Sequence, residues 1–314
     1  MADSKIWDVA VIGAGCAGLA AGMYAGRFGL KTVVIGELPG GTITQTHLVE
    51  NYPGFTSLTG LELGNKLLEH AKSYGVPIQM ESVESAKKRG DGLFEIKSDS
   101  AIYISKTIIF ATGADWKKLG MPSEKKFTNV GVHYCALCDG AFYKKKRIAV
   151  IGSGDSAIKE SLLLADFGSK VVILIRGDKM KGEPINNKRV SEHPKIEVFY
   201  NVEVKEFLGG AKLEKLKLTK KIKLKGGKES DEILMDAAFV LIGNVPRSEL
   251  AKTMSVKLDG KGQIIIDKMA RTNVEGIYSA GDVTDGEFKQ AIVSASEGVC
   301  AAYSAHLFLS KKEK

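Results

Sequence analysis

Proline and cysteine are scarce in this sequence, and long apolar runs are missing. The 314 residues include 7 prolines and 4 cysteines. No apolar stretch approaches the roughly 20 residues that a membrane-spanning helix needs. The opening residues, Met1–Trp7, lack the charged-then-apolar pattern of a signal peptide. We therefore expect a cytoplasmic protein, and in a reducing compartment a disulfide is more often catalytic than structural.

Signatures of nucleic-acid binding are also missing, because the sequence has no zinc-finger, RNA-binding or basic heptad pattern. The formal net charge of +8 comes from lysines spread along the chain, which is typical of a solvated surface. Attraction of an acidic protein or of phosphates is the alternative interpretation. We expect no nucleic-acid partner and no membrane partner.

Glycine, in contrast, is abundant, with 35 residues. A buried strand at Asp8–Ile12 leads through a glycine turn into a helix over Ala17–Gly29 and a strand over Thr32–Ile35. The same order recurs with a strand over Arg147–Ile151 and a helix over Asp155–Phe167. This repetition predicts an α/β protein with two Rossmann-like dinucleotide-binding units.

Further elements follow from local patterns. We expect a helix near Leu61–Tyr74 and a closing helix over Val293–Leu309. Alternating lysine and apolar residues between Leu213 and Lys228 predict a hairpin with one solvated face. Strands are expected at Leu93–Ser98, Ala101–Ile104, Thr107–Ala111, Val171–Ile175, Gln263–Asp267 and Ile277–Ala280.

The first glycine turn has the spacing of a dinucleotide-binding site. Gly13 permits a tight turn, Gly15 lets the backbone approach a pyrophosphate, and Gly18 lets helix and strand pack closely. The helix N-terminus then offers free N–H groups to the anion. Glu37 follows at the distance where an acid can bind a ribose hydroxyl.

Two remote segments favour FAD over a nicotinamide cofactor at this first turn. Gly40-Gly41 and the loop Glu50–Gly54 suit a large flat ligand, and Gly281-Asp282 can bring N–H groups and a carboxylate to a ribityl chain or pyrophosphate. Cys16 and Cys300 are expected to be small core residues without a chemical role.

The other two cysteines form the pattern Cys135-Ala136-Leu137-Cys138, followed by Asp139. Two thiols at this spacing can close a small disulfide ring, and a helix end lowers the pKa of one thiol. Asp139 can move a proton to or from a thiolate. The leading interpretation is a redox-active pair.

Two alternatives to a redox pair are a zinc half-site and a structural disulfide. Zinc normally takes four ligands, and His133 is the only nearby histidine. We therefore expect no bound metal. A structural disulfide is uncommon in a reducing compartment.

Seven motifs together resemble the low-molecular-weight, two-domain thioredoxin reductases, over nearly the whole chain. They are GAGCAG, GG…VENYPG, ATG…LGMPSE, CALCDG, GSGDSA, RTNVEGIYSAGD and KQA, in the order of the family. The resemblance implies an FAD domain at 1–116 and 247–314, split by a pyridine-nucleotide domain at 117–246 that carries the cysteine pair. It also implies a homodimer.

The resemblance assigns roles to residues of this chain. Cys138 would exchange electrons with the flavin, Cys135 would attack the disulfide of a thioredoxin-like protein, and Asp139 would donate or accept a proton. Expected FAD contacts are Gly13, Gly15, Gly18, Glu37, Gly41, Asn51, Gly281, Asp282, Gln290 and Ala291. Hinges near Lys117 and Pro246 would let the domains rotate between donor and substrate.

The electron donor is the point at which the sequence departs from the family. Expected pyridine-nucleotide contacts are Gly152, Gly154, Asp155, Ser156, Arg176 and Lys181. NADPH-using members carry a His-Arg-Arg-x-x-x-Arg pattern where this chain has Ile175-Arg176-Gly177 and, later, Lys181. Lysine supplies a point charge and not the two-pronged fork of arginine. Weak or atypical use of NADPH is ranked first, and NADH, reduced ferredoxin or a deazaflavin are the alternatives.

The sequence thus predicts an FAD-dependent thioredoxin-disulfide reductase. Two alternatives share its motifs. A flavin-dependent dithiol oxidase would pass the electrons to oxygen, and a flavin-bearing redox sensor would have negligible turnover. The acid beside the cysteine pair, Asp139, argues against the sensor, because a sensor needs no proton-transfer group there.

Overall fold

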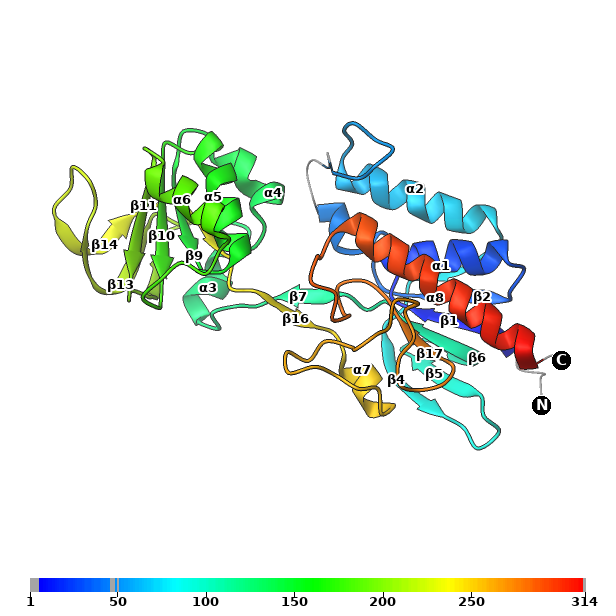
Figure 1. Cartoon of the computed structure of the whole chain (residues 1–314). Helices are drawn as coiled ribbons and strands as arrows, with labels where there is room; N and C mark the ends of the chain where they lie inside the picture. Colours follow the sequence, from blue (N-terminus) through cyan, green and yellow to red (C-terminus); the bar gives the residue numbers. More distant parts are fainter. Residues whose placement is uncertain (1–5, 46–48, 50, 313–314) are drawn as a thin grey trace. The chain divides into compact units, whose positions relative to one another are not determined.

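The structure is a computed structural model that describes residues 6–45, 49 and 51–312 (Figure 1). The side chains of Gln45, Leu137, Cys138 and Lys312 lie outside this description. The chain divides into two compact units. Unit 1 comprises Met1–Asp115 and Val245–Lys314, and unit 2 comprises Trp116–Asn244. Unit 2 is therefore inserted between the two segments of unit 1.

Unit 1 contains most of the long helices and one large sheet. Its first segment holds β1 (Ile6–Ile12), α1 (Cys16–Arg27), β2 (Thr32–Ile35), η1 (Gly41–Gln45), α2 (Gly60–Ser73), β3 (Ile78–Gln79), β4 (Val83–Lys88), β5 (Phe94–Ser98) and β6 (Ile102–Phe110). Its second segment holds α7 (Glu249–Thr253), β17 (Ile277–Ser279) and α8 (Ala291–Lys312). The strands β7 (Ala114–Trp116) and β16 (Asn244–Pro246) pair with each other where the chain passes between the units.

The sheet of unit 1 has the order β3-β2-β1-β6-β5-β4, and β17 also pairs with β6. The pairs β1–β2, β1–β6, β2–β3 and β6–β17 are parallel, and β4–β5–β6 is antiparallel. The central strands are buried apolar runs, as parallel strands covered on both faces must be. Their carboxyl ends therefore meet at one edge of the sheet.

One expectation for this sheet is wrong. The stretches Ala101–Ile104 and Thr107–Ala111 were expected to be separate strands, but they form the single strand β6. The residues between the two expected strands, Ser105 and Lys106, are polar. Ser105 is instead fully buried, because its hydroxyl donates to the carbonyl of Thr107 at 3.0 Å. A satisfied polar side chain can continue a buried strand.

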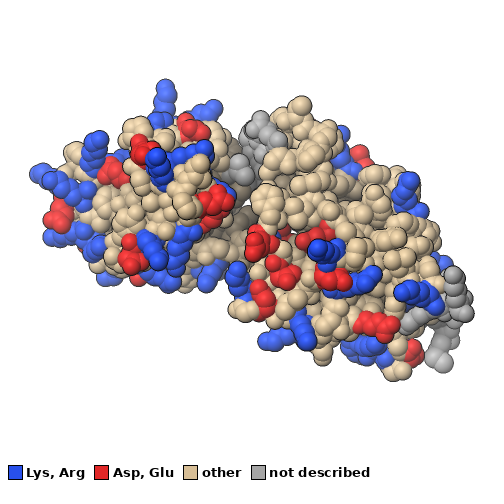
Figure 2. All heavy atoms as spheres, in the orientation of Figure 1, with Lys and Arg blue, Asp and Glu red and all other residues tan. Residues whose placement is uncertain are grey.

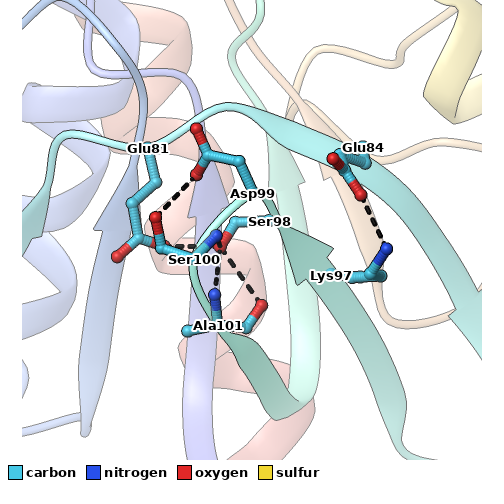
Figure 3. A network of polar contacts seen from close by, with 7 residues as sticks. All are labelled: Glu81, Glu84, Lys97, Ser98, Asp99, Ser100 and Ala101. Carbon is cyan, nitrogen blue, oxygen red and sulfur yellow. Dashed lines mark hydrogen bonds and ion pairs between the residues drawn. The ribbon is translucent and has the colours of Figure 1, made fainter.

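A polar network closes the antiparallel part of the sheet (Figure 3). The Glu81 carboxylate accepts hydrogen bonds from Ser98 Oγ at 2.5 Å and from Tyr103 Oη at 2.8 Å. Burial and this carboxylate raise the pKa of Tyr103 to about 12. Beside it, Lys97 Nζ lies 2.7 Å from Glu84 Oε2. These contacts fix β5 against its neighbours and lie outside the candidate site.

Helices α1 and α8 lie side by side over the sheet of unit 1 (Figure 1). A Cβ atom on Gly298 would lie 2.1 Å from the Ala17 carbonyl oxygen, so only glycine permits this approach. Among the described residues, α8 is the one helix long and apolar enough to cross a membrane. Its alanines Ala301 and Ala305 are fully buried in the core that α1 shares, which is typical of a core helix.

Unit 2 repeats the strand–turn–helix–strand order around its own sheet. It holds α3 (Pro122–Phe127), β8 (Val132–His133), α4 (Ala136–Asp139), η2 (Gly140–Tyr143), β9 (Arg147–Ile151), α5 (Asp155–Phe167), β10 (Lys170–Ile175), α6 (Pro184–Glu192), β11 (Ile196–Tyr200), β12 (Val204–Leu208), β13 (Lys215–Lys223), β14 (Glu229–Leu234) and β15 (Ala237–Val240). The parallel sheet has the order β11-β10-β9-β15-β8, and β12-β13-β14 form an antiparallel sheet.

The expected α/β class with two Rossmann-like units is confirmed. The predicted strand over Arg147–Ile151 and helix over Asp155–Phe167 match β9 and α5. The lysine-rich stretch Leu213–Lys228 supplies only the first strand of the expected hairpin, β13, and its partner β14 begins just beyond the stretch, at Glu229. The strand expected at Gln263–Asp267 is wrong, because Ile264 forms only isolated bridges. Lys and Arg side chains are dispersed over the face shown in Figure 2, with Asp and Glu among them.

Candidate active site

The first group of site residues lies at the carboxyl edge of the unit 1 sheet. Gly13 follows β1, Glu37 follows β2, and Gly281 follows β17. Backbone hydrogen bonds hold these strand ends together, from Gly13 N to the Ile35 carbonyl at 2.7 Å and from Ala280 N to the Phe110 carbonyl at 2.9 Å. Ligands of open α/β sheets bind at this edge, beyond the carboxyl ends of the strands.

The glycine turn after β1 has the geometry that the sequence predicts. Gly13 has a φ of +111°, and a Cβ there would lie 2.1 Å from the Ala111 carbonyl oxygen. A Cβ on Gly18 would lie 1.8 Å from the Gly13 carbonyl oxygen. At Gly15 the nearest atom to a Cβ is 3.8 Å away, and Gly15 is the N-cap residue of α1, which has no side-chain cap. Gly13 and Gly18 are thus packing residues, whereas Gly15 borders open space at a helix N-terminus.

A second pair of glycines packs directly on this turn. Gly40 N donates to the Ala14 carbonyl at 2.8 Å, and Gly15 and Gly40 form a parallel bridge. Gly41 has a φ of +67°, and a Cβ there would lie 2.7 Å from the Gly15 Cα. The segment after β2 therefore lies against the glycine turn, with Glu37 exposed beside it.

The segment after β17 is held by a residue that the sequence analysis missed. The Glu297 carboxylate accepts hydrogen bonds from Gly281 N at 2.7 Å and from Thr284 Oγ1 at 3.0 Å. Burial raises the pKa of Glu297. Ser294 Oγ donates to Asp282 Oδ1 at 3.2 Å. An acid within an apolar helix was the available signal, since such an acid needs nearby donors.

The remaining expected FAD contacts, Asn51 and Gln290, come together in the structure. Asn51 Nδ2 donates to Gln290 Oε1 at 2.9 Å. Ala291 begins α8 and packs against the cluster of Val49, Leu58 and Leu63. The loop before α2 and the start of α8 are therefore neighbours.

Together these groups fit a dinucleotide. The uncapped N-terminus of α1 with open space at Gly15 suits a pyrophosphate. Glu37 and Asp282 offer carboxylates at the same edge of the sheet, beyond the ends of β2 and β17. Cys16 lies in this turn as a buried free thiol, as expected. Burial, and then the charge of Asp282, raises its pKa to about 12, so it remains an unreactive thiol.

The second group of site residues surrounds Cys135 in unit 2. Cys135 is disulfide-bonded and partly buried. It directly precedes α4, and Asp139 N donates to the Cys135 carbonyl at 3.2 Å, which closes this turn. The backbone of Cys138 lies in α4, and its side chain lies outside the described residues. Over the described residues, no cluster of three potential metal-ligating side chains was found.

Asp139 has a partner that sequence reasoning did not assign to it. The His133 ring is buried, with Nδ1 3.1 Å from Asp139 Oδ2 and Nε2 2.8 Å from Tyr143 Oη. The Nδ1 atom lies close to the carboxylate but off the line of a hydrogen bond. The ring also stacks on Phe239. His133, Asp139 and Tyr143 thus form one polar group beside the cysteine turn.

The opposite end of the cysteine turn contacts a second acid. Glu160 of α5 accepts a hydrogen bond from Ala136 N at 2.8 Å. Burial raises the pKa of Glu160 to about 7, and the hydrogen bond from Ala136 lowers it in part. The sequence analysis did not single out Glu160. No local motif identifies it, because the contact joins two segments that are 24 positions apart.

The second glycine turn resembles the first in its packing. Gly152 has a φ of +148°, and a Cβ there would lie 2.2 Å from the Leu241 carbonyl oxygen. At Gly154 a Cβ would meet nothing within 4 Å. Lys181 N donates to the Ser153 carbonyl at 2.7 Å, which brings the segment after β10 to this turn.

The side chains expected to bind a pyridine nucleotide stand around this turn. Asp155 Oδ2 lies 2.7 Å from Lys159 Nζ, and its other oxygen accepts from Glu183 N at 3.2 Å. Ser156, Arg176 and Lys181 are exposed. A nucleotide phosphate at Gly154 would therefore meet an acid that is already paired, with two free cationic side chains on the neighbouring segment.

The chain belongs to the pyridine nucleotide-disulphide oxidoreductase family, whose sequence profile matches residues 7–298. Within this family it is of the low-molecular-weight thioredoxin reductase type. It is 36% identical to a thioredoxin reductase of Bacillus subtilis, over 100% of this chain and 98% of the relative. A thioredoxin reductase of Treponema pallidum is 37% identical, over 96% of this chain and 97% of the relative.

Solved structures give the same result. The thioredoxin reductase of Lactococcus lactis in its FR conformation matches with a TM-score of 0.80 and 35% identity, over 97% of this chain and 99% of that chain. The T. acidophilum thioredoxin reductase matches with a TM-score of 0.78 and 32% identity, over 99% of this chain and 100% of that chain. The resemblance seen in the motifs is thereby confirmed.

Proposed function

We propose that this protein is a thioredoxin-disulfide reductase. Electrons pass from NADPH to FAD, then to the Cys135–Cys138 disulfide, and finally to a thioredoxin-like protein. The observation that carries this proposal is a disulfide-bonded Cys135 beside the carboxylate of Asp139, in a unit with its own glycine turn. The relatives named thioredoxin reductase support it at full length.

FAD is assigned to unit 1, where it supplies two-electron chemistry between a nucleotide donor and a disulfide. Gly15 and the α1 N-terminus would hold the pyrophosphate, Glu37 would bind a ribose hydroxyl, and Asp282 would bind the ribityl or pyrophosphate region. Asn51, Gln290 and Ala291 would contact the flavin ring, and Gly13, Gly18, Gly41 and Gly281 would shape the backbone around the ligand. The fit of the glycine turn and the Asn51–Gln290 contact support this assignment.

The two cysteines have different roles in this proposal. Cys138 exchanges electrons with the flavin, and Cys135 attacks the disulfide of the protein substrate. Asp139 moves the proton, with His133 and Tyr143 behind it. Phe142, three residues after α4 ends at Asp139, is 71% exposed. Exposed aromatic residues beside a reactive site are typical of a surface that binds another protein.

NADPH is the proposed donor, bound at the second glycine turn. Gly152 shapes the turn, and Gly154 leaves room for a phosphate. Asp155 and Ser156 begin α5 there, and the exposed Arg176 and Lys181 supply positive charge for a 2′-phosphate. Only one arginine stands in this segment, which supports weak binding, since lysine lacks the two-pronged geometry of arginine. NADH, reduced ferredoxin and a deazaflavin are the competing donors.

Rotation of one domain against the other, about hinges near Lys117 and Pro246, is part of the proposal. At these crossings, Lys117 N donates to the Gly243 carbonyl at 2.8 Å, and β7 pairs with β16. Next to this connection, the Arg247 side chain donates two hydrogen bonds, of 2.8 and 2.7 Å, to the Asp115 carboxylate. The chain crosses between the units on this two-stranded connection.

We also propose a cytoplasmic homodimer. In unit 1, a largely apolar cavity of about 260 Å³ lies between α1, α2 and α8, lined by residues such as Leu19, Leu67 and Val299. An apolar hollow on a helical face is typical of subunit interfaces. Light scattering tests this proposal, with a dimer expected at twice the 33.8 kDa of the chain.

Anaerobic reduction tests the whole scheme. The purified protein should be yellow, and NADPH, NADH, reduced ferredoxin and a reduced deazaflavin are added in parallel while flavin bleaching is followed. The donor that bleaches the flavin should then support reduction of thioredoxin, counted as new thiols. A colourless protein, or one that no donor reduces, contradicts the proposal. Rapid oxygen consumption and peroxide formation with a small dithiol would instead identify a dithiol oxidase.

A further inference from the structure

The feature that the proposed function does not use is the second acid of the cysteine turn. Glu160 belongs to α5, the helix that begins at the second glycine turn. Its Oε2 accepts a hydrogen bond from the N–H of Ala136 at 2.8 Å. Ala136 is fully buried and directly follows Cys135. The charge of Glu160 therefore acts on the backbone amide of the residue that directly follows Cys135.

The surroundings of Glu160 make its charge easy to change. Burial raises the pKa of Glu160 to about 7, against the opposing effect of the Ala136 hydrogen bond. Near neutral pH the carboxyl group is therefore divided between its two protonation states. An ordinary surface glutamate would be ionised throughout this range.

Other charged groups lie on the same and on neighbouring elements. On α5 itself, Lys159 is held 2.7 Å from Asp155 and 3.4 Å from Glu183. The titratable groups of the elements packed on α5 are Cys135, Cys138, Asp139 and Tyr143 around α4 and η2, Lys188, Arg189 and Glu192 on α6, Arg147 on β9 and Lys170 on β10. While Cys135 is disulfide-bonded and carries no charge, the causes that shift the pKa of Glu160 are burial, which raises it, and the Ala136 amide, which lowers it.

We propose that Glu160 is a positioning residue of the redox site that shares one proton with Cys135, so that reduction leaves Cys135 as a thiolate and Glu160 as a neutral acid. The chemistry behind this is the repulsion between two neighbouring anions, which prevents a carboxylate and a thiolate from both ionising easily. The partner reaction rests on the proposed function, whereas the shared proton does not.

The atoms and electrons of the cycle balance. In molecules where Glu160 starts as a carboxylate, reduction of the enzyme disulfide takes up two electrons, supplied by the flavin of the proposed function, and two protons from solvent. One proton settles on Glu160 and the other on the second sulfur. The Cys135 thiolate then forms a bond to one sulfur of the protein substrate, whose disulfide breaks. The second sulfur resolves this mixed disulfide. The two protons end on the two substrate sulfurs, and Glu160 returns to its starting state.

Alkylation of a single thiol tests the proposal without donor or thioredoxin. In the full-length FAD-loaded protein, Cys138→Ser leaves Cys135 as the active-site thiol. The rate of its reaction with iodoacetamide is measured from pH 5 to 10, with Cys135 identified by peptide mass spectrometry. We expect two steps in the pH profile, because the first ionisation of a proton-sharing pair gives a thiolate in only part of the molecules.

Glu160→Gln in the same background should convert the profile to one step. The glutamine oxygen still accepts from the Ala136 amide but does not titrate. In the protein that keeps Glu160, the upper step should lie about one pH unit higher than the single step of the Glu160→Gln protein. At a pH below both steps, this shift corresponds to about a tenfold difference in the fraction of Cys135 thiolate. Asp166→Asn, an exposed acid on the same helix, is the matched control and should keep two steps.

Single-step profiles with the same midpoint in both proteins would overturn the proposal. Glu160 would then only accept the hydrogen bond that stabilises the turn. A thermal melt checks folding, and Glu160→Gln should melt no lower at pH 8, because it removes a buried ionised group. If Glu160→Gln does not fold, the pH profile of the Cys138→Ser protein tests the proposal by itself. A single step in that profile overturns it. Absence of thioredoxin turnover would contradict the proposed function and leave the alkylation result standing.

Discussion

The Asn51 side chain donates a hydrogen bond to the Gln290 side chain, with 2.9 Å between Nδ2 and Oε1 across 239 positions of sequence. This contact ties the loop before α2 to the start of α8, and each residue alone was expected to touch FAD. Because the two side-chain amides are hydrogen-bonded to each other, their positions are fixed before the cofactor binds.

Removing either side of this pair should weaken FAD binding. Asn51→Ala or Gln290→Ala loses about one hydrogen bond, worth about 1 kcal/mol or roughly fivefold in the FAD dissociation constant. Reconstitution of the apoprotein, followed by flavin fluorescence, measures this change. The double variant should cost less than the sum of the single ones, since the residues act together. Strictly additive losses would show that the two amides bind FAD independently.

Two glycines of the first turn should respond differently to alanine. Gly18→Ala places a Cβ 1.8 Å from the Gly13 carbonyl oxygen, so unit 1 must shift and the protein loses stability. Gly15→Ala finds 3.8 Å to its nearest neighbour, so the fold stays intact while FAD affinity falls. Thermal melting of the apoproteins and FAD titration separate the effects. Gly90→Ala, with nothing within 4 Å, is the neutral control.

The second glycine turn allows a test of the donor site. Gly154→Ala adds a Cβ that meets nothing within 4 Å, so the melting temperature should not change. The methyl group occupies the space assigned to the nucleotide phosphate, and the KM for NADPH should rise about tenfold or more, the equivalent of about 1.4 kcal/mol. An unchanged KM would show that the nucleotide does not bind at this turn and would favour a donor such as ferredoxin.

Local patterns in the sequence were sufficient for the parts of the site that each lie within one short segment. The glycine turn at Gly13–Gly18 and the cysteine turn at Cys135–Cys138 are of this kind, because the steric need for glycine and the reach of a disulfide act over a few residues. The helix over Asp155–Phe167 was also located to the residue. These features depend on neighbours along the chain.

Contacts made only by folding could not be predicted. Glu160 meets Ala136, Glu297 meets Gly281, and His133 meets Asp139 because separate elements pack together. No periodicity marks these residues. The error in β6 has the same origin, since Ser105 is polar in sequence but satisfied inside the sheet.

An ion pair of unit 2 should make stability depend on pH. Arg147 contacts Asp236 through Nε at 3.0 Å and Nη2 at 3.1 Å, and this pairing lowers the pKa of Asp236. A lowered folded-state pKa gives stability that is present above the unfolded value, near pH 4, and is lost as the pH falls through the folded value.

Asp236→Asn should therefore reduce the free energy of unfolding at pH 7 by about 1 kcal/mol, a modest value because solvent reaches both side chains. The difference should vanish below about pH 3, where the wild-type carboxyl group is protonated as well. Urea melts at the two pH values measure it. Asp231→Asn on β14 should show a smaller effect, because the Asp231 carboxylate is more exposed and its ion pair with Lys217 is longer, at 3.5 Å. An equal loss at both pH values would place the effect in packing and not in charge.

Substitution of one cysteine distinguishes the roles of the two. In the proposed scheme Cys138 faces the flavin, so Cys135→Ser leaves Cys138 as a free thiolate against the oxidised ring. A thiolate in that position donates charge to the flavin and produces a broad absorption band at long wavelength. Cys138→Ser should lack the band, because Cys135 then remains as the thiol directed toward the protein substrate. Spectra of both variants, recorded with bound FAD and titrated with acid, measure the band and its loss on protonation. A band in Cys138→Ser alone would reverse the two assignments. Cys135 would then face the flavin, and Cys138 would attack the substrate.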